Sequence, residues 1–209
     1  MMSVTQILSD IYPFNSQESW ITWLNRELES LWKSPVDYDS IMRTTQVTGD
    51  IIHTYFIEKA MGFPTVDLPE MFRDLQKPID DFIAEHNISW LICEFRIEKP
   101  NEYIWHPDLV VMKNWKWEKV KALCDIKTYG LYRKLLGLPE KNLVKLNGNM
   151  QKVSLQTSMY RDAIIFSKHN HIKAHWDVSK LFCYHIKHTG VEAFELKYDV
   201  SKYLQWKQQ

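Results

Sequence analysis

The sequence predicts an α/β (α+β) fold in which a central mixed β-sheet is flanked by helices. Two observations carry this prediction. Apolar residues recur at helical spacing in three segments before residue 87, whereas residues 89–128 contain strand-length segments rich in β-branched and aromatic residues. A further helical segment and two further strand-like segments follow, so helices and strands are mixed along one chain. The length of 209 residues suits one domain, with room for a small extra lobe.

Three helices are expected before the first strand. The first covers residues 15–33, and the second opens near Gly49 and runs through DIIHTYFIEKAMG. The third covers about residues 68–86, where Pro78 can kink it or split it. We expect residues 1–48 to form an N-terminal helical extension and residues 49–209 to form the core.

Five strands are expected after these helices. Three of them cover residues 89–98, 103–112 and 119–128, and the link KNWKWE between the last two is short enough for a hairpin. An excursion over residues 129–148 follows, with a short helix at LYRKLLG, and then a helix over about residues 149–167. Two strands, LFCYHIKHT and VEAFELKY, flank a turn at Gly190, and the tail DVSKYLQWKQQ can add a short helix.

The start of the chain and its cysteines indicate the compartment. No stretch reaches the roughly 18 apolar residues of a membrane-spanning helix, and MMSVTQILSDIYPFN lacks the basic and then apolar pattern of a signal peptide. We therefore expect a cytoplasmic, intracellular protein with no membrane partner, located in a host cell if it is viral. Its three cysteines lie in apolar segments without a C-x-x-C pair, which indicates buried thiols rather than a metal cluster.

The net charge is zero, but the charges are unevenly distributed along the chain. Residues 66–102 carry nine acidic and four basic side chains, whereas residues 113–152 carry ten basic and three acidic ones. The second section could present a positive surface to a polyanion, or it could be an ordinary solvated face. Trp115 and Trp117, in the hairpin link, are candidates either for stacking on unpaired bases or for packing against the sheet edge.

Two carboxylates and an amine interrupt the apolar pattern of neighbouring strands. Side chains alternate faces along a strand, so Asp125 and Lys127 share a face, with the Ile126 carbonyl between them. A simple hairpin pairs residue i near residue 231 − i, which places Asp108 diagonal to Asp125, within cross-strand reach of roughly 5–8 Å. A structural ion pair is one explanation of this patch.

A divalent cation is the other explanation, because two nearby buried carboxylates repel each other. Magnesium or manganese would take carboxylate and carbonyl oxygens, from Asp108, Asp125 and Ile126. The Lys127 amine could then orient or deprotonate a metal-bound water, and this arrangement suits hydrolysis of a phosphodiester.

The segments HPDLVV and CDIK together resemble the motif of the PD-(D/E)XK nuclease superfamily. GDIIHTYFIE resembles the Gly-x-x-x-His helix motif of its RecB-like branch, and QTSMY matches the Gln-x-x-x-Tyr motif of that branch. The motifs occur in the family's order over about residues 49–165, and the chain is similar to the compact nucleases of this branch that archaeal viruses encode. The resemblance implies a restriction-endonuclease-like core.

The same resemblance implies roles for individual residues. His53 would be a further metal ligand beside Asp108, Asp125 and Ile126, with Mg²⁺ or Mn²⁺ as the cofactor. Lys127 would act on the attacking water, and Gln156 and Tyr160, which are four residues apart and therefore on one helix face, would contact DNA near the scissile phosphate. The catalytic set is thus Asp108, Asp125, Lys127, Gln156 and Tyr160.

Three other groups fit the pattern less well. Glu58 follows His53 by five residues rather than the four usual in this branch, so the two would not share a helix face. Glu94 could support the site, but pairing with Arg96 on the same strand face is the favoured interpretation. A rival zinc or copper site could use the histidines His169, His171, His175, His185 and His188.

We therefore expect a divalent-metal-dependent deoxyribonuclease acting on DNA. Two alternatives stay open: a structure-specific endonuclease, such as a Holliday junction resolvase acting as a homodimer, and a catalytically silent DNA-binding protein. The sequence does not distinguish exonuclease from endonuclease action.

Overall fold

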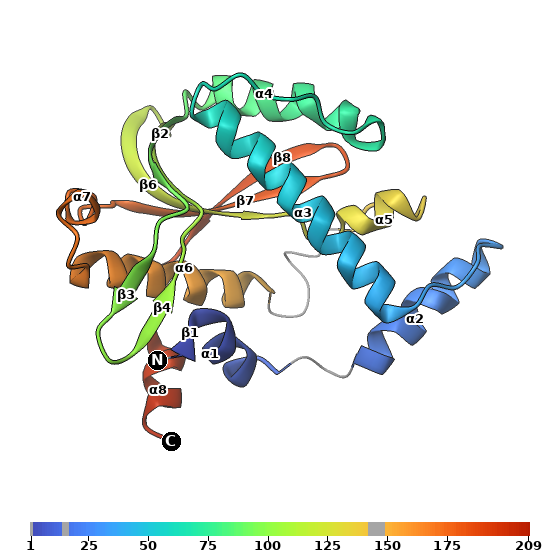
Figure 1. The fold of residues 1–209 in the computed structure, drawn as a ribbon, viewed down its shortest axis with the longest axis horizontal. Coiled ribbons are helices and arrows are strands. Elements are labelled where there is room, and N and C mark those ends of the chain that lie inside the picture. Colours follow the sequence, from blue (N-terminus) through green and yellow to red (C-terminus); the bar gives the residue numbers. More distant parts are fainter. Residues whose placement is uncertain (1, 14–16, 142–148) are drawn as a thin grey trace.

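A five-stranded mixed sheet forms the centre of the protein, which is seen in a computed structural model that describes residues 2–13, 17–141 and 149–209 (Figure 1). The strand order is β2-β5-β6-β7-β8, with β6 and β7 parallel and the other neighbours antiparallel. The predicted fold class, a mixed sheet flanked by helices, is confirmed. The strands are β2 (Ser89–Cys93), β5 (Leu109–Trp115), β6 (Glu118–Lys127), β7 (Lys180–Lys187) and β8 (Gly190–Leu196).

Both faces of this sheet are covered by helices. Strand alternation sends Leu181 and Cys183 of β7 into one core, and Phe182 and Tyr184 into the other. The first core lies under α1 (Val4–Ile11) and α6 (Asn149–Phe166), and the second lies under α3 (Tyr38–Ala60), η1 (Glu70–Leu75) and α4 (Gln76–Glu85). Burial on both faces explains why β5, β6 and β7 are apolar along most of their length.

A small second sheet was not predicted. It consists of β1 (Met2–Ser3), β4 (Tyr103–Trp105) and β3 (Ile97–Lys99). It exists because each of the first two predicted strands is broken in the middle, between β2 and β3 and between β4 and β5. Glu94 adopts a left-handed backbone conformation at the first break, and Pro107, which has no N–H for a ladder, lies in the second.

The second predicted helix begins earlier than expected. α3 starts at Tyr38, where the Asp37 side chain caps it by accepting a hydrogen bond from the Ser40 backbone N–H at 2.8 Å. Gly49 is therefore in the middle of this helix, and the boundary predicted between residues 48 and 49 falls inside it. The division of the chain at that point stays a prediction.

The other predicted helices are present. α2 (Gln17–Ser30) matches the first, and η1 followed by α4 replaces the single helix over residues 68–86. Pro78 lies in the first turn of α4, where its missing N–H has no helical partner to lose, so it does not kink the chain. α5 (Leu131–Leu135) and α8 (Ser201–Lys207) were also predicted, whereas α7 (Asn170–Lys173) was not. Residues 142–148 of the predicted excursion lie outside the described residues.

The predicted register of the β5–β6 hairpin is wrong by two residues. Leu109 pairs with Cys124, so partners sum to 233 rather than 231. The strands continue to a two-residue loop, Lys116–Trp117, whose positive φ angles of 46° and 72° match the tight turn favoured in hairpins. Because the error is even, every side chain keeps its predicted face.

The two tryptophans of this link differ in environment. Trp115 packs edge-on against Phe182, with ring centroids 4.8 Å apart, whereas Trp117 is fully exposed at the hairpin tip. Packing is therefore the explanation for Trp115, and base stacking stays a prediction for Trp117 alone.

Lys113 is a cation inside the second core. Its side chain is completely buried, and its Nζ has no hydrogen-bond partner among the described residues. The Nζ lies over the rings of Phe182, Tyr184, Trp115 and Phe82 at 4.1, 4.7, 4.9 and 5.8 Å. These rings attract the ammonium, but burial still lowers the pKa of Lys113 to about 8.

We expect Lys113→Met to raise the free energy of unfolding at pH 7 by about 1–3 kcal/mol, because methionine fills the space without a buried charge. Between the folded pKa near 8 and the unfolded value of 10.5, the folded state binds fewer protons, so wild-type stability rises with pH there. The advantage of the variant should therefore shrink between pH 8 and pH 10, as measured by urea unfolding. A destabilised variant, or an advantage independent of pH, would contradict the prediction.

Candidate functional site

Residues from four separate segments meet at one end of the central sheet. Asp108 directly precedes β5, and Asp125 and Lys127 lie at the end of the neighbouring strand β6. His53 reaches them from α3, and Gln156 reaches them from α6 on the other face of the sheet. One rung beyond the Leu109–Cys124 pair, the corrected register places Asp108 opposite Asp125 rather than diagonal to it.

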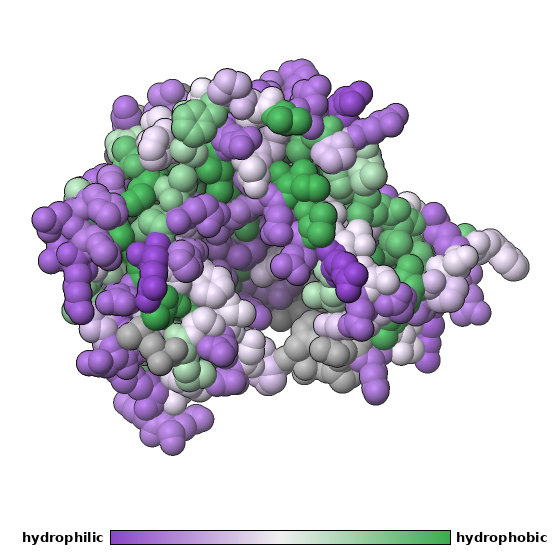
Figure 2. Space-filling model, in the orientation of Figure 1, coloured by the Kyte–Doolittle hydropathy of each residue, from purple (hydrophilic) through white to green (hydrophobic). Residues whose placement is uncertain are grey.

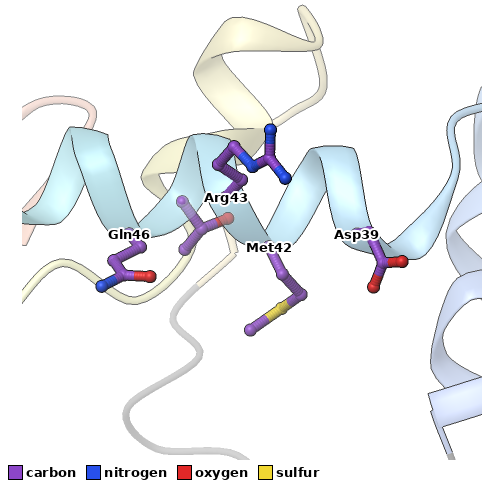
Figure 3. A pocket seen from close by; sticks show the side chains of 5 residues that line it. Asp39, Met42, Arg43 and Gln46 are labelled. Atoms are coloured by element: carbon purple, nitrogen blue, oxygen red, sulfur yellow. The ribbon is translucent and has the colours of Figure 1, made fainter.

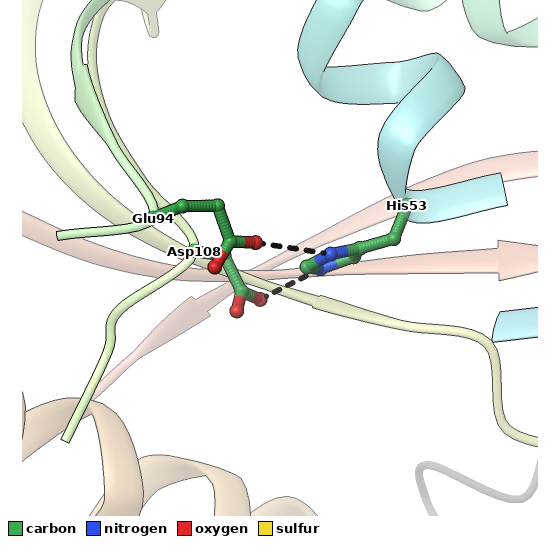
Figure 4. Close-up of side chains that lie close together, drawn as sticks. All are labelled: His53, Glu94 and Asp108. Atoms are coloured by element: carbon green, nitrogen blue, oxygen red, sulfur yellow. Dashed lines mark ion pairs between the residues drawn. The ribbon is translucent and has the colours of Figure 1, made fainter. Parts of the chain in front are cut away.

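The His53 ring faces two carboxylates, those of Glu94 and Asp108 (Figure 4). Its Nε2 is 3.0 Å from Asp108 Oδ2, and its Nδ1 is 3.6 Å from Glu94 Oε1. One ligand atom from each of these three side chains lies within 4.8 Å of the others, which makes them a possible metal-binding group. Burial alone would lower the pKa of His53, but the hydrogen bonds and charges of Asp108 and Glu94 outweigh it and raise the pKa to about 10.

Gly49 allows α3 to bring His53 to the sheet. A Cβ atom added at Gly49 would lie 3.2 Å from Thr128 Oγ1, just beyond the end of β6. A side chain at this position would therefore require Thr128 to shift by a few tenths of an ångström.

Asp108 is fixed by its neighbour strand. Its Oδ2 accepts a hydrogen bond of 2.6 Å from the Ile126 backbone N–H. Burial alone would raise the pKa of Asp108, but His53, Lys127 and this hydrogen bond outweigh it and lower the pKa. Asp108 is thus held ionised and aimed at His53.

Asp125 is the buried centre of a second set of contacts. It is 0% exposed; its Oδ2 is 2.7 Å from Lys127 Nζ, and its Oδ1 accepts a hydrogen bond of 3.2 Å from Gln156 Nε2. Burial, and then the nearby charge of Asp108, outweigh the opposing charge of Lys127 and raise the pKa of Asp125 to about 6. Asp125 lies outside the group of three around His53.

Tyr160 holds the Gln156 side chain in position. The Gln156 amide donates to the Tyr160 hydroxyl, and the Tyr160 ring stacks on Trp105 with centroids 6.0 Å apart. Tyr160 is 0% exposed and Gln156 is 8% exposed. In this structure burial keeps the Tyr160 ring and hydroxyl from the surface, and Tyr160 positions the amide that holds Asp125. The predicted contact of Gln156 and Tyr160 with DNA stays a prediction.

The donor set partly matches the predicted metal ligands. His53 and Asp108 belong to the group of three, and oxygen and imidazole ligands suit Mn²⁺ and also fit Mg²⁺. Asp125 is adjacent but engaged by Lys127 and Gln156, and Ile126 contributes its N–H to Asp108. A ligand role for Asp125 and for the Ile126 carbonyl stays a prediction.

Glu94 is the member of the group that sequence reasoning placed elsewhere. It faces His53, and Arg96 instead lies 4.0 Å from Glu98. Glu94 has a positive φ of 43°, and its N–H donates to the Asp108 carbonyl at 3.1 Å, which joins the two strand breaks. Glu58 is not part of the group.

The rival histidine site does not form among the described residues. The only potential metal group found there is that of His53, Glu94 and Asp108. His185 Nε2 is instead 2.9 Å from the Tyr129 carbonyl, and His188 Nε2 is 3.2 Å from the Gly130 carbonyl. These two rings secure the turn that follows β6.

Most of the basic section is neutralised within the molecule. Of its ten cations, Lys113 is buried and six others have carboxylate partners: Lys116, Lys121, Lys127, Arg133, Lys134 and Lys141. Among the described residues, the section therefore does not form a continuous free positive surface, and its binding to a polyanion stays a prediction.

A scan of the sequence against protein-family models found no match, and a search of curated proteins also found none. Among the described residues, no helix has the length and apolar character that crossing a bilayer requires.

Proposed function

We propose that the protein is a divalent-metal-dependent deoxyribonuclease. The observation that carries this proposal is the meeting of Asp108, Asp125 and Lys127 at adjacent strand ends, with His53 brought to Asp108 from α3. Asp108 and Asp125 repel each other across the adjacent strand ends, and a bound cation would relieve this repulsion. The resemblance of the motifs to RecB-like nucleases supports DNA as the substrate.

The residues of the site would have different roles in the reaction. A divalent cation, when bound, polarises a phosphoryl oxygen and lowers the pKa of an attacking water. His53, Glu94 and Asp108 would hold it, and the Lys127 amine would orient the water. Gln156 and Tyr160 would keep Asp125 in place beside Lys127. Each of these groups is preorganised by contacts that exist before any substrate binds.

The test is cleavage of labelled single-stranded, duplex and four-way-junction DNA with Mg²⁺ or Mn²⁺, with and without EDTA. We expect cleavage that needs the metal and that falls by at least about 10²-fold in Lys127→Ala. Cleavage that survives chelation would sink the mechanism. Paired incisions restricted to the junction would instead support the dimeric resolvase, and binding without cleavage would support the silent DNA-binding protein.

The lining of a shallow pocket on α3 is a separate feature. Asp39, Met42, Arg43, Thr45 and Gln46 line it, and Met42 and Gln46 point to the same side of the helix (Figure 3). The mixed lining of this pocket identifies no ligand, and we assign it no function. Figure 2 shows both hydrophilic and hydrophobic residues around a hollow near the middle of this face of the molecule.

A further inference from the structure

One cation of the basic section has no carboxylate partner and lies at the site. Lys152 is on α6, one turn before Gln156, and its side chain is half-buried. No hydrogen bond or ion pair joins it to another described residue, in contrast to its six paired neighbours in the basic section. Residues 1, 14–16 and 142–148, outside the described part, contain no aspartate or glutamate that could supply one.

Lys152 also lies close to a second amine. Burial lowers its pKa, and the charge of Lys127 lowers it further. Lys127 already has Asp125 at 2.7 Å, and the other oxygen of Asp125 is taken by Gln156. Lys152 is thus a partly buried cation near another cation, and the carboxylate that pairs with Lys127 is already engaged by Lys127 and Gln156.

A negatively charged ligand would remove this mismatch. An isolated, partly buried ammonium is unfavourable unless an anion and hydrogen-bond acceptors accompany it. Lys152 lies one helical turn from Gln156, the amide that holds Asp125, and its charge interacts with that of Lys127, so it is near the strand end that carries these two residues. A phosphate oxygen carries negative charge and accepts hydrogen bonds, so it would supply both of the interactions that Lys152 lacks.

We propose that Lys152 binds a backbone phosphate of DNA next to the reacting centre. The inference rests on the proposed nuclease function and adds to it a substrate-binding residue. Lys152 does not touch the group around His53, so it would act on DNA affinity more than on the chemical step. Binding through one phosphate contact is independent of base sequence.

The experiment measures affinity for a fluorescent oligonucleotide in EDTA between 50 and 300 mM NaCl. Removing one phosphate contact should reduce the slope of log K against log [salt] by about 0.7–0.9. Lys152→Met should therefore show this smaller slope and about tenfold weaker binding at low salt, and Lys152→Arg should keep the wild-type slope. Lys173→Met, at an exposed position of α7, is the matched control and should behave as wild type.

A second arm titrates inorganic phosphate at constant ionic strength. It should weaken DNA binding by the wild type and have less effect on Lys152→Met, because free phosphate would compete for the same amine. An unchanged salt slope in Lys152→Met would overturn the inference, as would an equal loss in Lys173→Met. Either result would overturn only the role of Lys152. The proposed nuclease function is tested separately, and it fails if the wild type shows no metal-dependent cleavage in a parallel assay.

Discussion

Replacing Asp125 with asparagine is expected to reduce metal-dependent DNA cleavage on the order of 10³-fold or more. Asparagine keeps the shape of the side chain and can still accept the hydrogen bond from Gln156. It removes the negative charge from the carboxylate that orients Lys127, whose Nζ then faces an amide instead of an ion-pair partner. The loss should appear in kcat, because a contact to the reacting centre is removed rather than a contact to distant DNA.

The fold should survive this substitution. The pKa of Asp125 is raised to about 6, first because burial disfavours its ionised form. A carboxyl whose folded pKa lies above its unfolded value binds more protons when folded, so its ionisation lowers stability as pH rises from about 4 to 6. A neutral asparagine lacks that unfavourable ionisation, and this offsets part of the lost pairing with Lys127.

The control is the same substitution at an acid outside the site. Asp177 pairs with Lys121 at the other end of β6, so Asp177→Asn should leave cleavage unchanged. Circular dichroism and thermal unfolding of both variants separate loss of chemistry from loss of fold. If Asp125→Asn is folded and cleaves within about tenfold of wild type, Asp125 is not part of the machinery.

The strand pattern made much of this site predictable. Alternation along a strand places Asp125 and Lys127 on one face whatever the partner strand does. The hairpin register was wrong by two residues, yet an even error preserves the faces, so Asp108 still meets Asp125. Local periodicity thus determined which side chains converge, although it did not determine how closely.

Glu94 shows where sequence reasoning stops. Its place beside His53 depends on a left-handed backbone conformation in the middle of a predicted strand. Glycine and asparagine are common in the left-handed conformation, but glutamate is not. The sequence therefore contains no local indication of the break between β2 and β3. Pro107 did mark the facing break, and a proline inside a predicted strand could have been taken as its end.

Tyr160 illustrates a different limit. Helical spacing correctly placed it on the face of Gln156, but it did not show how deeply that face is buried. α6 packs on the central sheet and also contacts β3 and α1, so even Thr157 and Ser158 are buried. Such burial depends on elements distant in sequence, including Trp105 of β4, which no pattern within the helix reveals.

Arg133→Met should cost about 3–5 kcal/mol of unfolding free energy, the largest stability effect that we expect. The Arg133 side chain is 0% exposed, and its two terminal nitrogens donate to the two Glu27 carboxylate oxygens at 2.9 and 2.6 Å. Its Nε also donates to the Pro139 carbonyl at 2.8 Å. Methionine fills the space but leaves Glu27 with only Lys141 and leaves that carbonyl without its donor.

The acid dependence of stability should change as well. The hydrogen bond from Arg133 is the main reason that the pKa of Glu27 is lowered to about 2. A lowered carboxyl pKa contributes stability that is complete above the unfolded value of 4.5 and is lost as pH falls towards 2. Arg133→Met should therefore lose less stability than wild type between pH 5 and pH 2, in urea titrations at each pH.

Arg73→Met, at an exposed arginine of η1, provides the matched control and should change stability by less than about 0.5 kcal/mol. A loss below about 1 kcal/mol in Arg133→Met would show that the Arg133–Glu27 pair contributes little to stability.

Arg133 lies in α5, whose first residue, Leu131, donates to the Thr128 carbonyl just after Lys127. Loosening α5 therefore frees the chain that follows the strand end carrying Asp125. Any loss of cleavage in this variant should accordingly be restored at lower temperature, unlike the loss in Asp125→Asn.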